Sequence, residues 1–282
     1  MAATQHQLSA APFDAAAARY DETFTHTNIG KAQRNAVWRY LERTFQTGQR
    51  VLEIGCGTGI DACFLAKRGV HVVACDSSSQ MLAVAGRRIA ERRFQRMVQP
   101  VVLAAEDVAS LHTSALFDGA FSNFGALNCV EDIGKFAADL AKLLRPGARA
   151  LLVWIGPFCL WEMVWYLSHG DGKKAFRRLE RDGVPARIAG GPTFRVTYPK
   201  IGSLADAFSP MFRMRSVRGI GVAVPPSYTE QWASRHLRLL NVLEKGDAIL
   251  GRLPGIRSLA DHVVLEFERT STNTTPIEGA RT

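Results

Sequence analysis

Apolar runs of strand length alternate with stretches of helical periodicity through most of this 282-residue chain. The runs are rich in Val, Leu, Ile and Phe, whereas the stretches between them place apolar residues three or four positions apart. Such alternation is typical of an α/β protein with a parallel sheet. A helix is predicted before the first run, over residues 28–45. The predicted strands lie near residues 50–55, 71–76, 100–104, 117–122, 148–154, 213–224 and 262–269.

Three glycines at alternate positions follow the first predicted strand. Gly55, Gly57 and Gly59 lack a Cβ, so the backbone can turn sharply and a ligand can approach the main chain closely. A helix predicted over residues 61–67 would present free amides and the positive end of its dipole to that ligand. A strand, a glycine loop and a helix in this order begin a nucleotide-binding, doubly wound sheet.

A carboxylate is placed to bind the sugar of such a ligand. Asp76 ends the second predicted strand, about 20 positions after Gly55, where an acidic residue can accept hydrogen bonds from ribose hydroxyls. A ligand that contains adenosine is therefore predicted. A dinucleotide site needs its third glycine at position 60, which is Ile60, and a P-loop lysine is missing. An NAD site or an ordinary strand–loop–helix connection remains the alternative interpretation.

The glycine loop extends to a longer pattern with an acidic residue in front of it. Glu53, Gly55, Gly57 and Gly59 form E-x-G-x-G-x-G, with Cys56 between the first two glycines. Here the chain resembles the class I S-adenosylmethionine-dependent methyltransferases, and five motifs follow in family order over residues 50–155. The resemblance implies an α/β fold with a Rossmann-like, doubly wound seven-stranded sheet whose last pair is antiparallel. It also implies S-adenosyl-L-methionine as cofactor, bound in part by the residues of this loop.

The resemblance assigns the adenosine end of the cofactor to two further motifs. In that family an acidic residue after the second strand binds both ribose hydroxyls, and nearby residues flank the ribose and adenine. An acidic residue and an amide of the third motif meet the adenine. These roles fall on Asp76, Ser77, Met81, Asp107 and Val108, with Glu106 as the alternative to Asp107.

The methionine end of the cofactor is assigned by the fourth motif and by the N-terminal segment. Asn123 and Phe124 end the fourth motif. Tyr20 belongs to a Tyr-Asp-x-x-Phe stretch that small-molecule members of the family carry, and Arg34 is the accompanying basic candidate. Asn123, Glu106 and Asp107 could instead have a loop or helix-capping role. Tyr20 could be a packed aromatic residue, and Arg34 a surface cation.

The segment between the fifth and sixth predicted strands is longer than a simple connection. It begins with an aromatic-rich helix pattern that includes Trp161 and Trp165, and it then turns basic. We interpret it as a helical lid over the methyl-acceptor pocket, although the same pattern fits an ordinary packed helix. The predicted organisation is an N-terminal helical cap (1–48), a cofactor-binding core (49–155), an acceptor lid insertion (156–200), a closing part of the core (201–270) and a flexible tail (271–282).

A formal net charge of +9 raises the hypothesis of an anionic partner. Two predicted helical segments hold the main basic clusters, and either could bind phosphates or the headgroups of an anionic surface weakly. A solvated helix face is the favoured interpretation, since charge runs on amphipathic helices usually face water. The clusters are Arg87, Arg88, Arg92, Arg93 and Arg96, and Lys173, Lys174, Arg177, Arg178 and Arg181.

Other sequence features limit the cellular setting. The five cysteines lack C-x-x-C pairs and are predicted to be reduced core residues, and the seven histidines lack metal-ligand spacing, so no metal is expected. The N-terminus shows no secretory signal pattern, and no apolar stretch reaches membrane-spanning length. A cytoplasmic location is therefore predicted.

These observations predict direct (SN2) methyl transfer to a small, apolar or aromatic organic acceptor. Small molecules are favoured over nucleic acid, because residues 122–125 depart from the Asn-Pro-Pro-Tyr type of signature and no RNA-binding module is visible. The alternatives are an RNA methyltransferase that uses the basic helices and a non-catalytic cofactor-binding protein. The catalytic base stays unassigned among Glu162, His169 and Asp171.

Overall fold

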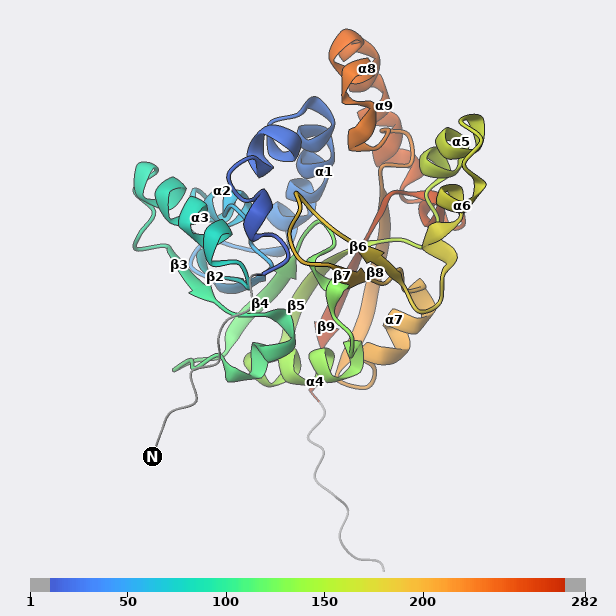
Figure 1. Ribbon diagram of the computed structural model, residues 1–282. Helices are drawn as coiled ribbons and strands as arrows, with labels where there is room; N and C mark the ends of the chain where they lie inside the picture. Colours follow the sequence, from blue (N-terminus) through green and yellow to red (C-terminus); the bar gives the residue numbers. More distant parts are fainter. Residues whose placement is uncertain (1–10, 272–282) are drawn as a thin grey trace, which may run out of the picture.

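Seven strands form the central sheet of the protein, in the order β3-β2-β1-β4-β5-β9-β8 (Figure 1). The computed structural model describes residues 11–271. β1 to β5 are parallel, whereas β9 lies antiparallel between β5 and β8. The strands are β1 (Arg50–Ile54), β2 (His71–Asp76), β3 (Val98–Val102), β4 (Phe117–Ser122), β5 (Leu144–Ile155), β8 (Phe212–Ile220) and β9 (His262–Arg269).

The direction in which the sheet grows reverses between β1 and β4. β2 and β3 follow β1 on one side, while β4 and β5 lie on the other. In doubly wound sheets a crevice opens at this point, outside the carboxyl ends of the strands. The predicted seven-stranded, Rossmann-like sheet is thereby confirmed, including its antiparallel last pair.

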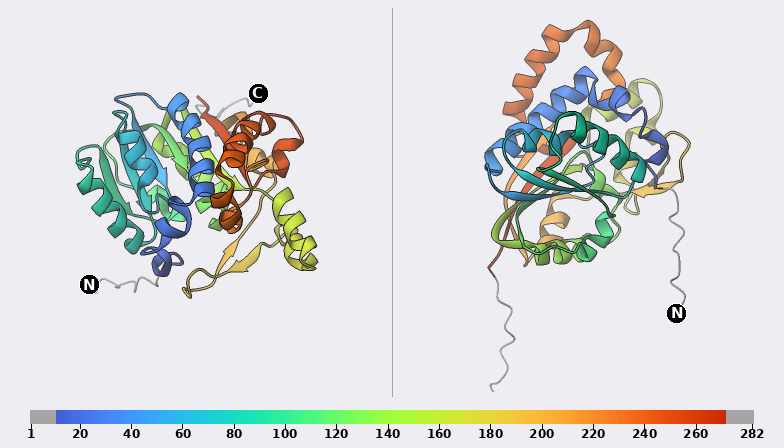
Figure 2. Two further views of the ribbon diagram at one scale, coloured as in Figure 1. Left: turned by 90° about the horizontal axis from the view of Figure 1, so that it is seen from above. Right: turned by 90° about the vertical axis from the view of Figure 1, so that its left-hand side faces the viewer.

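Helices cover both faces of the sheet (Figure 1 and Figure 2). Side chains alternate along the strands, so Val51 and Val72 pack with one helical layer, and Leu52 and Val73 pack with the other. The first layer comprises α1 (Asn28–Thr44), α2 (Ile60–Ala66) and α3 (Ser79–Glu91), and the second comprises α4 (Ile133–Leu143) and α7 (Ile201–Phe208). The helix predicted over residues 28–45 is thus confirmed as α1.

The predicted strand boundaries differ from the structure mainly at three places. β5 begins at Leu144, four residues before the predicted start, since Leu144 already pairs with Phe117 of β4. β3 begins at Val98, two residues before the predicted start. β8 ends at Ile220 instead of continuing to residue 224, because Gly221 has a φ of +79° and turns the chain. The buried carboxylate of Asp247 then holds this turn, accepting hydrogen bonds from the amides of Gly221 (3.0 Å) and Ala223 (2.8 Å).

Two helices that the sequence analysis did not single out lie beyond this turn. α8 (Glu230–Arg235) and α9 (Leu237–Leu250) pack on α1 through a small apolar cluster that includes Ile29, Ala233 and Leu240. Figure 1 shows the pair as the uppermost part of the molecule, in orange. They extend the helical layer that carries α1.

The insertion between β5 and β8 consists of two different parts. α5 (Leu160–Ser168) and α6 (Gly172–Ala175) stand beside the sheet, on the right in Figure 1. A short hairpin of β6 (Val184–Ala186) and β7 (Phe194–Val196) follows and runs back towards the centre of the molecule. The insertion is therefore not one helical lid, and its role over an acceptor stays a prediction.

None of the helices within residues 11–271 is both long and apolar enough to cross a membrane. All five cysteines are free thiols, and Cys129 is the one that is only partly buried. The expectations about a signal sequence and about the flexible tail fall on residues 1–10 and 272–282, which lie outside the described part of the chain.

Candidate functional site

A cavity of about 580 Å³ lies at the carboxyl edge of the sheet, where β1, β2 and β4 end. Its size is in the usual range for a small-molecule or cofactor site. Nine of the residues predicted from the sequence line it: Tyr20, Gly55, Gly57, Asp76, Ser77, Met81, Glu106, Asn123 and Phe124. The crevice predicted from the strand order therefore holds a real cavity.

The glycines of the loop serve different purposes. A Cβ on Gly57 would meet no atom within 4 Å, so this residue leaves open space beside a wall of the cavity, and its φ of +53° favours glycine. A Cβ on Gly59, in contrast, would lie 2.8 Å from the side chain of Ala85. Gly59 therefore permits the close packing of α2 on α3, and it does not line the cavity.

Asp76 is fixed by two backbone amides at the end of β2. Its Oδ2 accepts a hydrogen bond from the amide of Gly57 (2.7 Å), and its Oδ1 accepts one from the amide of Ser78 (2.9 Å). Each carboxylate oxygen can accept a second bond, so the side chain can still bind two hydroxyls in the cavity. Burial raises the pKa of Asp76, while the two amide bonds oppose the rise. Open space at Gly57 beside a fixed carboxylate fits a bound nucleoside.

A chain of buried polar contacts fixes the end of β4. The carboxylate of Asp61 accepts hydrogen bonds from Arg34 Nη1 (2.5 Å), Trp38 Nε1 (2.6 Å) and Asn123 Nδ2 (2.9 Å). Asn123 Oδ1 in turn accepts a bond from the amide of Phe124 (2.9 Å). These contacts hold Phe124 at a φ of +49°, which is uncommon for a bulky residue.

Phe124 forms an aromatic wall of the cavity. Its ring is packed edge to face against Phe24, with ring centres 4.9 Å apart, and against His262, at 5.4 Å. The guanidinium of Arg34 lies 4.6 Å from the same ring centre. Three side chains thus fix the orientation of one ring at the edge of the cavity.

Relatives of the chain are methyltransferases. A sequence profile described as "Methyltransferase domain" matches residues 51–147. A demethylmenaquinone methyltransferase of Clavibacter sepedonicus is 34% identical over 145 residues, 50% of this chain and 56% of that protein. The chain thus spans little more than half the length of the demethylmenaquinone methyltransferases it matches. A malonyl-[acyl-carrier protein] O-methyltransferase of Enterobacter lignolyticus is 30% identical over 218 residues, 76% of this chain and 79% of that protein.

The chain belongs to the class I S-adenosylmethionine-dependent methyltransferases. Solved structures agree in fold: the CcbJ methyltransferase from Streptomyces caelestis has a TM-score of 0.60 at 16% identity, covering 94% of this chain and 100% of that chain. A DhpI complex with S-adenosylhomocysteine has a TM-score of 0.57 at 16% identity, covering 92% and 94%. The prediction of S-adenosyl-L-methionine as cofactor is thereby confirmed.

Six residues predicted to bind the cofactor do not line the cavity of this methyltransferase. Arg34, Glu53, Cys56 and Val108 are buried behind its walls, Gly59 packs on α3, and Asp107 is exposed outside it. Burial raises the pKa of Glu53 well above its usual value, and neither its Oε2 nor Arg34 Nε has a hydrogen-bond partner among the described residues. The cofactor contacts of these six residues stay predictions, and the geometry favours Glu106 over Asp107.

Several cavity residues were missed because they come from segments without a motif. Pro12 and Phe13 belong to the segment that precedes α1, and Thr193, Phe194 and Arg195 belong to the β6–β7 hairpin. The rings of Phe13 and Phe194 lie 5.5 Å apart, so the two segments meet over the cavity. The others are Leu103, Ala104, Ala105, Ala126, Cys129 and Glu131. Burial raises the pKa of the Cys129 thiol to about 11, which keeps it neutral.

The three candidate bases of the insertion do not reach the cavity. Glu162 is 2% exposed and binds Arg177 and Arg178, while Asp171 accepts a bond from the amide of Lys174 and caps α6. His169 is exposed and contacts Trp165. The contacts of each side chain lie within the insertion and away from the cavity, so none of the three is supported as a catalytic base.

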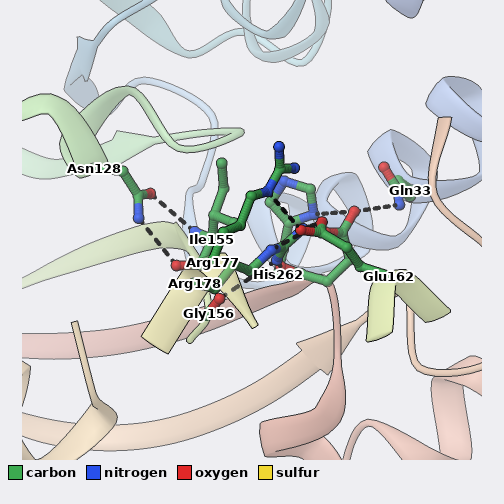
Figure 3. A network of polar contacts seen from close by, with 9 residues as sticks. Gln33, Asn128, Ile155, Gly156, Glu162, Arg177, Arg178 and His262 are labelled. Carbon is green, nitrogen blue, oxygen red and sulfur yellow. Dashed lines mark hydrogen bonds and ion pairs between the residues drawn. The ribbon is translucent and has the colours of Figure 1, made fainter. Parts of the chain in front are cut away.

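A buried ionic network ties the insertion to the sheet beside the cavity (Figure 3). Arg178 donates hydrogen bonds to Glu162 Oε2 (from Nε, 3.0 Å) and to Asp261 Oδ1 (from Nη2, 2.8 Å). The next residue after Asp261 is His262, whose ring touches Phe124. The position of the insertion is thus coupled through a few contacts to a wall of the cavity.

Proposed function

We propose that this chain transfers the methyl group of S-adenosylmethionine directly to a small, apolar or aromatic acceptor. The observation that carries the proposal is the composition of the cavity. Asp76 and Gly57 form a polar edge that suits the nucleoside, whereas Phe13, Phe124 and Phe194 add aromatic walls to the same cavity. Such a space suits a cofactor together with an apolar partner.

The bound cofactor supplies an electrophilic methyl group on a sulfonium. The residues of the chain have to hold an acceptor in line with that methyl group and exclude water. Asn123 and Asp61 fix Phe124, and an aromatic face beside a sulfonium attracts its positive charge. Tyr20 lines the cavity as well, and burial raises its pKa, so its hydroxyl stays protonated and can donate a hydrogen bond.

The relatives support acceptors with apolar or acyl groups. Their names state a demethylmenaquinone and a malonyl-[acyl-carrier protein] as the molecules on which they act. The aromatic walls and the neutral thiol of Cys129 favour an apolar acceptor over a malonyl group, which carries a carboxylate. We infer that the acceptor enters between the segment before α1 and the β6–β7 hairpin.

Two of the basic residues that had raised the RNA alternative face inward. Arg88 of α3 donates to the carbonyl of Thr58 and to Asp21, and Arg178 is buried against Glu162 and Asp261. Their charges are compensated within the protein. The alternative of an RNA methyltransferase is therefore not favoured.

Turnover with defined acceptors tests the proposal. Purified protein is incubated with S-adenosylmethionine and with hydroxynaphthoquinones, phenols or malonyl thioesters, and both S-adenosylhomocysteine and the methylated product are quantified by mass spectrometry. We expect product from at least one of these classes, and a rate that Asp76→Ala lowers at least about fivefold when S-adenosylmethionine is limiting. Tight binding of S-adenosylhomocysteine without product from any class would instead identify a non-catalytic cofactor-binding protein.

A further inference from the structure

α5 presents its apolar side chains to the solvent and its charged side chain to the interior. Leu160, Val164 and Leu167 are 45%, 55% and 50% exposed, and their spacing places them on one face of the helix. Glu162, on the same helix, is only 2% exposed. A helix on the surface of a protein normally has the opposite polarity. An outward apolar face of this kind indicates contact with an apolar environment.

The neighbouring turns extend this apolar face. Trp165 is 41% exposed, and its ring centre lies 5.7 Å from that of Tyr228, which is 42% exposed. Phe176 and Leu179 are each 44% exposed. We call the α5 surface the set Leu160, Val164, Trp165, Leu167, Phe176 and Leu179.

The buried network of Figure 3 fixes this polarity. Arg178 is itself buried and holds Glu162 on the inner side of the insertion by bonds from Nε and Nη2. The same guanidinium binds Asp261 at the start of β9. Rotating α5 to bury its leucines would break these ion pairs, so the apolar face stays outward.

Four cations and three carboxylates surround the α5 surface, on a chain whose formal net charge is +9: Lys173, Lys174, Arg177 and Arg181, and Asp171, Glu180 and Asp182. Lys173 and Arg181 have no ion-pair partner within residues 11–271, and Lys174, although paired with Asp171, keeps a side chain that is 58% exposed. Bulky apolar and aromatic side chains beside lysine and arginine are typical of segments that lie on an anionic membrane surface.

We propose that the α5 surface docks the protein on a lipid bilayer that contains anionic headgroups. The leucines and aromatic rings enter the boundary of the acyl chains, and Lys173, Lys174 and Arg181 meet the headgroups. No membrane-spanning segment is needed for such contact. The interaction does not depend on which acceptor is methylated.

Co-sedimentation with vesicles tests this surface. The full chain is mixed with phosphatidylcholine vesicles with or without an equal share of phosphatidylglycerol, at low and at high salt. We expect binding to the anionic vesicles that salt weakens, and at least about tenfold less binding for the double variant Val164→Glu/Leu167→Glu. Calorimetry with S-adenosylhomocysteine shows that the variant has kept its fold.

The matched control is Val242→Glu/Ile249→Glu on α9, which changes two side chains of similar exposure, 61% and 65%. We expect this variant to bind vesicles as the unmodified protein does. Undiminished binding by the α5 variant, or an equal loss in both variants, would overturn the proposal. It would also be overturned if the unmodified protein were a dimer that only the α5 variant dissociates, because the surface would then join two copies.

Discussion

The carboxylate of Asp76 joins the glycine loop to the second strand of the sheet. It accepts hydrogen bonds from the amides of Gly57 and Ser78, and it lines the cavity at the same time. The residue therefore both shapes the loop and remains able to bind hydroxyl groups. Removing the carboxylate should therefore weaken cofactor binding, because both the shape of the loop and the hydrogen bonds to hydroxyl groups are lost.

We expect Asp76→Ala to weaken S-adenosylmethionine binding by about 1–3 kcal/mol, the range for losing a charged hydrogen-bond acceptor. Isothermal calorimetry measures the change. Asp206→Ala is the matched control, because Asp206 is an exposed carboxylate of α7 that does not line the cavity. Equal affinities of the Asp76 variant and the unmodified protein would contradict the ribose role.

The pair Asp261 and His262 makes the stability of the fold dependent on pH. Burial alone would raise the pKa of Asp261, but the charges of His262 and Arg178 lower it to about 2. Since the folded pKa is below the ordinary value of about 3.9, this carboxylate stabilises the fold above pH 4 and loses that contribution as the pH falls towards 2. Burial lowers the pKa of His262, so acid opposes folding there as well.

Asp261→Asn should therefore lower the free energy of unfolding by about 2 kcal/mol near pH 6, with a difference that shrinks between pH 4 and pH 2. Urea unfolding monitored by circular dichroism at several pH values gives the two curves. Asp206→Asn, which changes an exposed carboxylate of α7, serves as the control and should leave the curve unchanged. Parallel curves for the Asp261 variant and the unmodified protein would refute this assignment.

At the scale of elements, a buried arginine supplies the ionic contact between α5 and the start of β9. Removing Arg178 leaves Glu162 and Asp261 buried without their main cation. Breaking a buried pair in this way costs about 3–5 kcal/mol. We expect Arg178→Met to lose that much in urea unfolding, whereas the exposed control Arg181→Met changes stability by less than about 0.5 kcal/mol. Similar stability of both variants would show that the insertion is held elsewhere.

The elements that local sequence determines were predicted well. β1, β2 and β4 are mostly apolar, and the glycine loop and Asp76 lie at fixed distances along the chain, so the polar edge of the cavity could be located. The β6–β7 hairpin has strands of three residues, too short for a periodic pattern. Its contact with Phe13 depends on tertiary packing, as does the inward position of Glu162 that removed it from the candidate bases.

At the scale of the whole molecule, the segment before α1 forms one wall of the cavity and is tied to the glycine loop. Asp21 accepts a hydrogen bond from the hydroxyl of Thr58 in the glycine loop (2.8 Å), and it forms an ion pair with Arg88 of α3. Burial opposes the charge of Asp21, but these partners outweigh it and lower its pKa. The same segment carries Phe13 and Tyr20 to the cavity wall. Figure 2 shows it beside α3 and the hairpin, in dark blue.

This arrangement predicts that Asp21 controls how fast the cofactor product leaves. A bound ligand under the segment can depart only after the contacts with Thr58 and Arg88 open, so Asp21→Asn should raise the dissociation rate of S-adenosylhomocysteine by about tenfold. Association should change little, because most affinity differences between variants lie in dissociation. Surface plasmon resonance resolves the two rates. Glu22→Gln is the control, since this neighbour has a side chain that is 73% exposed and forms an ion pair with Arg19, its one such partner in residues 11–271. A slower association with unchanged dissociation would mean that Asp21 shapes the open site instead of closing it.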